Sequence, residues 1–313
     1  MTPGRWRILF WGRWGLFDRV VAVDWSARSA PSPVKPVKDA IYMCDKVRGR
    51  VAHPTYHRTR AVAMQAVCAA LDRAIAAGER VFLGFDFGFG YPAGFARALT
   101  GQPDALAVWD WLEREIVDGP DNANNRFDVA AAINTRFGGI GPFWGCPIGR
   151  DGPDLPAKGS LRHGHGLPDR RAVELGVKSA QSGFKLFTTG SVGSQSLLGL
   201  PHLARLRRRY AEKLTVWPMQ TGWGLPDAPI VLAEIYPSLF KPSHLIPLTA
   251  RYPGELYHIP DAVQVRTVCD VISSAPDSTL ARGFECPTGL ADAARVAREE
   301  GWIFGAELGK TSA

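Results

Sequence analysis

Apolar runs that end close to an acidic residue recur along the chain. Residues 19–24 form a largely β-branched apolar run that closes on an aspartate, and residues 80–86 repeat the pattern. A third run, residues 229–237, passes through Glu234. Continuous apolar runs of this length predict strands that are buried on both faces. Such strands belong to parallel or mixed sheets that helices cover on both sides.

Shorter patterns fill the chain between these runs. Residues 39–45 and 50–57 predict two further strands in a meander with the first. Residues 59–77 predict a helix, because Thr59 is a suitable N-cap and Gly78 stands at the stop position. Further helices are predicted over residues 95–100, 105–117, 128–136, 200–214 and 262–274.

The order of elements predicts an α/β fold with a mixed five-stranded sheet of order 3-2-1-4-5, flanked by helices. A large insertion rich in Gly and Pro separates the fourth strand from the fifth. The predicted divisions are a flexible N-terminal tail (1–18), a core (19–118 and 229–275), an insertion that covers the edge of the site (119–228) and a C-terminal helical tail (276–313).

Composition narrows the class of protein only slightly. The chain has 313 residues, of which 46% are hydrophobic and 21% charged, as in ordinary globular proteins. The net charge of +7 and the pI of about 9.3 permit an anionic partner without requiring one. No apolar run approaches the ~20 residues that span a bilayer, so we expect no membrane partner.

The cysteines and the N-terminus suggest a location. The five cysteines are scattered without CxxC spacing, so neither a zinc site nor a disulfide framework is expected, and a cytoplasmic location fits. The first 16 residues alternate Trp and Arg without a small-residue cleavage site. We interpret them as a flexible tail or an over-extended start rather than a signal peptide, with a membrane-surface anchor as the alternative.

The acidic residues are the main candidates for chemistry. In the predicted sheet, Asp24, Asp86 and Glu234 end neighbouring strands and should converge on one edge, where open α/β sheets keep their sites. Asp261, in the first turn of a helix, could reach the same place, with Asp270 as a weaker rival. For each acid alone, a cap, a turn, a surface charge or an arginine partner is the plainer explanation.

Carboxylates this close repel one another unless a cation neutralises them. Oxygen ligands select Mg²⁺ or Mn²⁺, so the metal ligands predicted are Asp24, Asp86 and Glu234, with Asp261 completing the catalytic site. Two such ions about 3.5–4 Å apart would clamp a phosphodiester while water attacks it.

Four motifs carry a family resemblance: VAVDWS around Asp24, GFDFGFGYP around Asp86, AEIYPS around Glu234 and DAVQ from Asp261. They resemble those of an uncharacterised family described as predicted nucleases with an RNase H fold, related to Holliday-junction resolvases. The resemblance implies an RNase H-like core with these four residues as its acids. Some similar bacterial sequences carry a label for molybdopterin guanine dinucleotide synthesis, and the resemblance implies an accessory role in that synthesis as an alternative function.

Polar residues in the insertion are candidates for substrate binding. A Gly/Ser-rich loop with lysines upstream could hold a phosphate at a helix start, and an arginine could meet a phosphate bidentately. The candidates are Asn124, Asn125, Arg126, Lys185, Ser191, Ser194 and Gln195. N-caps and turns are the plainer explanation for them. Four arginines at positions 205 and 207–209 form either a nucleic-acid footprint or a solvated helix face.

The preferred function is therefore a metal-dependent nuclease or phosphodiesterase that acts on nucleic acid or on a small phosphoester. One alternative is a phosphoryl or nucleotidyl transferase, because sugar kinases and actin-like ATPases share the RNase H core. Only one copy of that core is visible here, whereas those enzymes have two. A non-catalytic binding module that keeps the fold is the other alternative.

Overall fold

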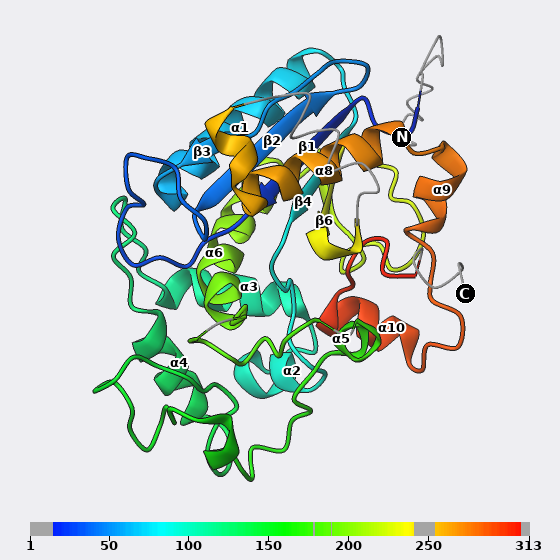
Figure 1. Cartoon of the computed structure of the whole chain (residues 1–313). Helices are drawn as coiled ribbons and strands as arrows, with labels where there is room; N and C mark the ends of the chain where they lie inside the picture. The colour runs from blue at the N-terminus through cyan, green and yellow to red at the C-terminus, as the bar shows by residue number, and fades with distance from the viewer. Residues whose placement is uncertain (1–14, 178, 189, 241–253, 308–313) are drawn as a thin grey trace.

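The computed structural model describes residues 15–177, 179–188, 190–240 and 254–307. Most of the predicted N-terminal tail lies outside these residues. The described chain is an α/β fold, with helices on both faces of a mixed sheet (Figure 1). No helix within these ranges is both long enough and apolar enough to cross a membrane.

The sheet has six strands in the order β3-β2-β1-β4-β6-β5. The strands are β1 (Arg19–Asp24), β2 (Ile41–Val47), β3 (Thr55–His57), β4 (Val81–Phe85), β5 (Leu214–Val216) and β6 (Ile230–Glu234). β1, β4, β6 and β5 run parallel, while β2 is antiparallel to both β1 and β3.

The predicted count of five strands was wrong. β6 takes the place of the predicted fifth strand, and β5 adds an edge strand beyond it. β5 is only three residues long and lies within the predicted insertion, so its alternation of apolar and polar residues is too short to predict a strand.

The helices that were predicted by residue range are present with shifted ends, two short helices lie in the predicted C-terminal helical tail, and one short helix in the insertion was not predicted. They are α1 (Arg60–Ala76), α2 (Phe95–Thr100), α3 (Ala105–Glu115), α4 (Arg126–Asn134), α5 (Ala172–Gly176), α6 (Gly193–Arg209), α8 (Pro260–Ser274), α9 (Asp277–Arg282) and α10 (Ala293–Arg295). Thr59 caps α1 as predicted, with its side chain accepting from the backbone N–H of Val62.

The sheet separates two apolar clusters. The first, here called the α1/α6 side, contains Val21 and Val23 with apolar residues of α1, α3 and α6. The second, the α8 side, contains Val20 and Ala22 with apolar residues of α8 (Figure 1). Because successive side chains of a strand point to opposite faces, β1 supplies both clusters from one continuous run.

Small residues line the α8 side at the centre of the sheet. Ala22, Gly84 and Ala233 are in register across β1, β4 and β6. A Cβ at Gly84 would lie 2.7 Å from the side chain of Ile235, so only glycine allows that side chain to pack against β4. This close packing fixes the chain immediately after β6 against the centre of the sheet.

The predicted insertion supplies part of the core as well as loops. Leu197, Leu200 and Leu203 of α6 are fully buried in the α1/α6-side cluster, and β5 joins the sheet. The green part of the chain between α3 and α6 gathers at the end of the sheet where β4 runs into the loop toward α2 (Figure 1). The segment therefore both completes the core and surrounds the carboxyl ends of the parallel strands.

Candidate functional site

Asp24 and Asp86 stand side by side at the ends of neighbouring strands. Asp24 is the last residue of β1, and Asp86 directly follows β4. The strands are parallel, with Val23 paired to Phe85, so the next residue of each strand is one of these acids. The backbone N–H of Trp25 donates to Asp86 Oδ1 at 2.7 Å. We call these two residues the aspartate pair.

The alternation of side chains along β1 and β4 places both members of the aspartate pair on the α8 side of the sheet. Asp24 comes two residues after Ala22, which belongs to the α8-side cluster. Asp86 comes two residues after Gly84, whose Cβ position faces Ile235 of that cluster. Because side chains alternate with period two, both carboxyl groups leave the sheet toward α8.

Two further carboxylates lie close to the pair. Asp261 is in the first turn of α8, which packs against β1 and β2. Its Oδ2 accepts from the backbone N–H of Asp39 at 2.6 Å. The charges of Asp261 and Asp39 both contribute to raising the pKa of Asp24. α8 and the loop before β2 therefore bring negative charge to the end of β1.

The pKa values of these groups show that their charge is poorly compensated. Burial, and then the charge of Asp86, hold the pKa of Asp24 well above its usual range. Burial raises the pKa of Asp86 to about 7, although the backbone N–H of Trp25 lowers it in part. Burial also raises the pKa of Asp261. Carboxyl groups shifted in this direction are stable when protonated or beside a bound cation.

No cationic side chain within the described ranges forms a salt bridge with the aspartate pair, and no positive charge is among the main causes that shift either pKa. Asp24 is only 8% exposed, so water solvates its carboxylate poorly. Asp86 is more open to solvent. The pair is thus a partly buried concentration of negative charge that a small cation could reach.

Glu234 does not share the face of the aspartate pair. Parallel pairing of β4 and β6 sets Glu234 opposite Phe85, one residue before Asp86. Glu234 is in phase with Ile230 and Leu232, which both belong to the α1/α6-side cluster. A difference of one residue in register moves a strand side chain to the opposite face. Glu234 therefore leaves the sheet on the side away from the pair.

Arg171 neutralises Glu234. Its Nη1 and Nη2 each donate to a different carboxylate oxygen of Glu234 at 2.7 Å. The backbone N–H of Phe89 donates to Oε2 at 2.9 Å. Arg171 also pairs through Nε with Glu174 at 2.7 Å, and all three charged side chains are buried. Protein groups thus occupy both carboxylate oxygens that were predicted to bind metal.

Fewer of the predicted ligands are therefore available to a metal ion. Within the described parts of the chain, no three or more His, Cys, Asp and Glu side chains are grouped so as to hold a metal ion. The predicted ligand set of Asp24, Asp86 and Glu234 does not assemble, because Glu234 pairs with Arg171. The aspartate pair alone fits one Mg²⁺, which commonly binds one or two carboxylates while waters and substrate phosphates complete its shell.

Three of the predicted substrate-binding residues meet. Arg126, the first residue of α4, donates from Nε to Ser194 Oγ at 2.9 Å and from Nη1 to Asn124 Oδ1 at 2.8 Å. Nη1 also donates to Ser29 Oγ at 2.9 Å. We call these four residues the Arg126 cluster. It joins the loop after β1 to the starts of α4 and α6.

Gln195 links the Arg126 cluster to the aspartate pair. It follows Ser194 in the first turn of α6, and its Nε2 donates to the carbonyl oxygen of Trp25. The N–H of the same Trp25 donates to Asp86. The chain of contacts from the cluster to the pair therefore passes through one tryptophan backbone.

The other predicted substrate-binding residues make separate contacts. The Asn125 side chain bonds to backbone groups around the end of α3, as a turn residue does. Lys185 Nζ lies 5.9 Å from the centroid of the Trp144 ring. The backbone N–H of Ser191 donates to the carbonyl oxygen of Thr188 at 3.1 Å. Their role in substrate binding stays a prediction.

Sequence reasoning did not single out Ser29, Asp39 or Arg171. Asp39 could have been found, because the predicted antiparallel meander places the start of the second strand beside the end of the first. Ser29 lies in a loop that the sequence marks only as a connection. Arg171 lies in a segment without a strand pattern, and nothing in its surroundings indicates that it reaches β6.

The arginines near the end of α6 do not form a free basic surface. Each pairs with an acid of α3 or α1: Arg205 with Glu113, Arg207 and Arg208 with Asp110, Arg208 also with Glu113, and Arg209 with Asp72. These intramolecular pairs favour a solvated helix face over a nucleic-acid footprint.

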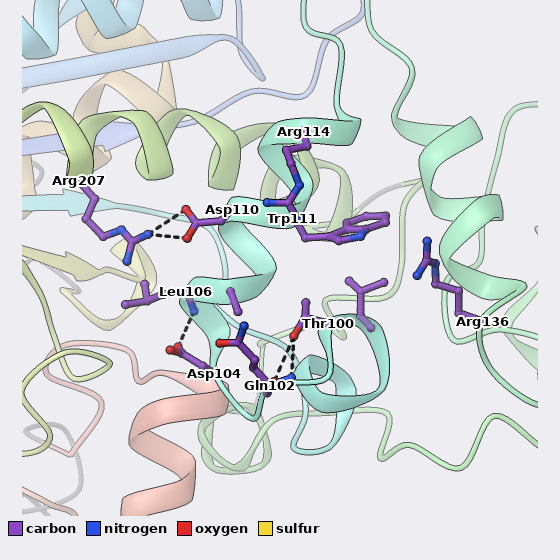
Figure 2. Close-up of a pocket in the computed structure, with 11 residues that line it drawn as sticks. Thr100, Gln102, Asp104, Leu106, Asp110, Trp111, Arg114, Arg136 and Arg207 are labelled. Atoms are coloured by element: carbon purple, nitrogen blue, oxygen red, sulfur yellow. Dashed lines mark hydrogen bonds and ion pairs between the residues drawn. The ribbon is translucent and has the colours of Figure 1, made fainter.

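A cavity of about 470 Å³ is lined by residues of α2, α3 and α6, and by no residue of the aspartate pair or the Arg126 cluster (Figure 2). Figure 2 shows the Arg207 guanidinium bonded to both carboxylate oxygens of Asp110. Arg136 lies 5.4 Å from the centroid of the Trp111 ring. None of the predicted site residues lines this cavity.

The site thus combines two opposite charges. The aspartate pair offers negative charge to a cation, and the Arg126 cluster offers a buried guanidinium to an anion. Both adjoin the loop that follows β1. Comparison of the chain with protein-family models, with curated proteins and with solved structures found no match.

Proposed function

We propose that this protein is a divalent-cation-dependent hydrolase of phosphodiester bonds in which Asp24 and Asp86 hold Mg²⁺ or Mn²⁺. The observation that carries the proposal is the aspartate pair: two carboxylates on one face of adjacent strands, with raised pKa values and no cationic partner among the described residues. A bound divalent cation would remove this repulsion.

The arrangement of strands supports an RNase H-like core. An antiparallel meander of β3, β2 and β1 continues into parallel β4 and β6, and β5 is an added edge strand. The acids that the family resemblance names at the ends of the first and fourth strands are the two members of the pair. Because folds of this kind host several chemistries, the aspartate pair is the stronger argument for hydrolysis.

The chain's own residues take distinct roles in this proposal. Asp24 and Asp86 hold the cation, which when bound polarises the phosphodiester and favours attack by water. Asp261 lies near enough to influence both pKa values, and its own raised pKa suits a proton acceptor for that water. Glu234 has a structural role through its pair with Arg171. The substrate is a nucleic acid or a smaller phosphoester.

Hydrolysis of bis(4-nitrophenyl) phosphate and of a nucleic-acid panel tests the proposal, with Mg²⁺ or Mn²⁺ and with a chelator. We expect cleavage only with the metal. Asp24→Asn and Asp86→Asn should each lower the rate by at least about 100-fold, since each removes half of the carboxylate ligands.

Asp270→Asn is the matched control. Asp270 is an aspartate of α8 that pairs with Lys46 and Arg266, so it is not part of the aspartate pair. Its substitution should leave the rate unchanged. Cleavage that persists in the chelator, or that survives Asp24→Asn, would overturn the proposal. Calorimetric titration with Mn²⁺ should show one binding event that both substitutions in the pair abolish.

A further inference from the structure

Arg126 is a buried guanidinium whose hydrogen bonds all go to neutral groups. Its side chain bonds to the hydroxyls of Ser29 and Ser194 and to the amide oxygen of Asn124. The residue is 7% exposed. No described residue accepts a hydrogen bond from Nη2, so part of its donor fork remains unused.

Asp118, the acid whose charge acts on Arg126, pairs with other cations. Asp118 receives two hydrogen bonds from Arg60, at 2.5 and 2.7 Å, and a third from His202. Burial, with the charges of Arg60 and Arg150, lowers the pKa of Arg126 to about 10, although Asp118 opposes this shift. The guanidinium is therefore charged at neutral pH without a carboxylate of its own. A buried charge of this kind is costly until a counter-ion binds.

The start of α6, which contacts Arg126 through the Ser194 hydroxyl, adds two backbone donors. Backbone N–H groups in the first turn of a helix have no acceptor within the helix. The N–H of Gly193 donates to the carbonyl oxygen of Lys185 at 3.0 Å. Those of Ser194 and Gln195 have no acceptor within the described ranges. α6 has 17 residues, so its dipole also favours an anion at this end.

We propose that the Arg126 guanidinium and the first turn of α6 together bind a phosphate group. Arg126 supplies the full positive charge and a planar fork, and Ser194 and Gln195 supply backbone donors. Asn124, Ser29 and the Ser194 hydroxyl hold the guanidinium in place.

The phosphate site also indicates a substrate class, and this second step rests on the proposed function. The contacts from Ser194 through Gln195 and Trp25 to Asp86 put the phosphate site beside the aspartate pair but not within it. The substrate class is therefore a phosphodiester that carries a second phosphate on the same chain, as an oligonucleotide does.

Calorimetric titration of the full chain with inorganic phosphate tests the site, with chloride at equal ionic strength as the reference. We expect wild-type protein to bind phosphate. Arg126→Lys should raise the dissociation constant for phosphate by at least about tenfold, and Arg126→Gln should abolish binding. Arg150→Gln is the matched control, because Arg150 lies near the same Phe127 ring but is exposed and pairs with Asp128.

The outcomes separate the two proposals. Failure of wild-type protein to bind phosphate, or equal binding by a folded Arg126→Gln variant, overturns the phosphate site. Asp24→Asn should keep phosphate binding while it loses hydrolysis, so the phosphate site can stand if hydrolysis is never observed.

A separate kinetic experiment tests the substrate class. In Arg126→Gln, KM for a dinucleotide with a 5′-phosphate should rise at least about tenfold, whereas KM for the same dinucleotide without that phosphate should not change. An equal effect on both substrates overturns the assignment.

Discussion

Asp86 connects the stability of the fold with the proposed chemistry. Burial raises its pKa to about 7, and the charges of Asp261 and Glu234 add to this effect. In the unfolded chain an aspartate has a pKa of about 3.9. Between these two values the folded protein binds more protons than the unfolded chain does. The contribution of Asp86 to stability therefore falls as the pH rises through that interval.

We predict that the free energy of unfolding of the metal-free protein falls as the pH rises from about 4 to about 7. Asp86 alone should contribute a slope of up to about 1.4 kcal/mol per pH unit. Asp86→Asn removes this group and also the charge that helps to raise the pKa of Asp24, so the slope should become smaller. Urea unfolding in a chelator at a series of pH values measures both slopes.

The difference in slope between wild type and Asp86→Asn tests the prediction, because histidine ionisation also changes the free energy of unfolding in this pH interval. Asp270→Asn should keep the wild-type slope, since Asp270 pairs with Lys46 and Arg266 away from the pair. Equal slopes for wild type and Asp86→Asn would show that Asp86 is ionised normally in the folded protein, and the argument for a strained aspartate pair would fail.

At the scale of an element, the register of β6 decides what its terminal acid can do. Glu234, the last residue of β6, pairs with Phe85, which comes one residue before Asp86. Glu234 therefore faces the α1/α6 side, where Arg171 binds both of its oxygens. The pair connects the end of β6 to the residue just before α5, next to the buried side chains of Glu174 and Glu300.

We predict that Glu234→Gln destabilises the protein by about 3 kcal/mol, because among the described residues it leaves the buried charge of Arg171 with Glu174 as its one carboxylate partner. It should leave Mn²⁺ affinity unchanged. Asp24→Asn should do the opposite: lose Mn²⁺ affinity without a comparable loss of stability. Urea unfolding and calorimetric titration of the two variants check both halves. A Glu234→Gln variant of normal stability and reduced Mn²⁺ affinity would restore Glu234 as a ligand.

The contrast between the two acids also shows what sequence patterns could predict. Continuous apolar runs predicted β1, β4 and β6, because a strand buried on both faces needs no polar position. The runs also located Asp24 and Asp86 at strand ends. They did not reveal the face of Glu234, because relative register depends on how the strands pair and not on either strand alone.

Helix α6 shows a second limit. Residues 193–199 contain two glycines and two serines, and Pro201 follows, so local propensity placed the start of the helix at about residue 200. In the structure, Leu197 and Leu198 are fully buried before that point, and their packing outweighs the local preference. Ser194 thus lies in the first turn of the helix, where it meets Arg126. The candidates were visible individually, but their meeting depends on the fold.

At the scale of the whole molecule, the segment between α3 and β6 is part of the core. The buried leucines of α6 belong to the same cluster as Val21 and Val23 of β1. β5, from the same segment, pairs with β6 at Leu214–Val216. A segment that supplies both a strand and a core-forming helix should not unfold independently of the sheet.

We predict that the amides in the second half of α6 exchange with solvent only through global unfolding, with the same free energy as those of β1 and β4. α6 and the sheet stabilise each other, because the leucines of α6 pack against apolar side chains of the sheet. If α6 unfolded alone, both apolar surfaces would be exposed to water. Native-state hydrogen exchange at increasing denaturant measures these free energies residue by residue. The short helix α9, with Leu280 as its one fully buried side chain, serves as the comparison and should exchange through smaller openings.

Exchange of α6 at a free energy well below that of β1 would mean that the segment between α3 and β6 is an independent unit. The Arg126 cluster could then open without disturbing the aspartate pair, and the contact through Gln195 and Trp25 would no longer place the two in one site.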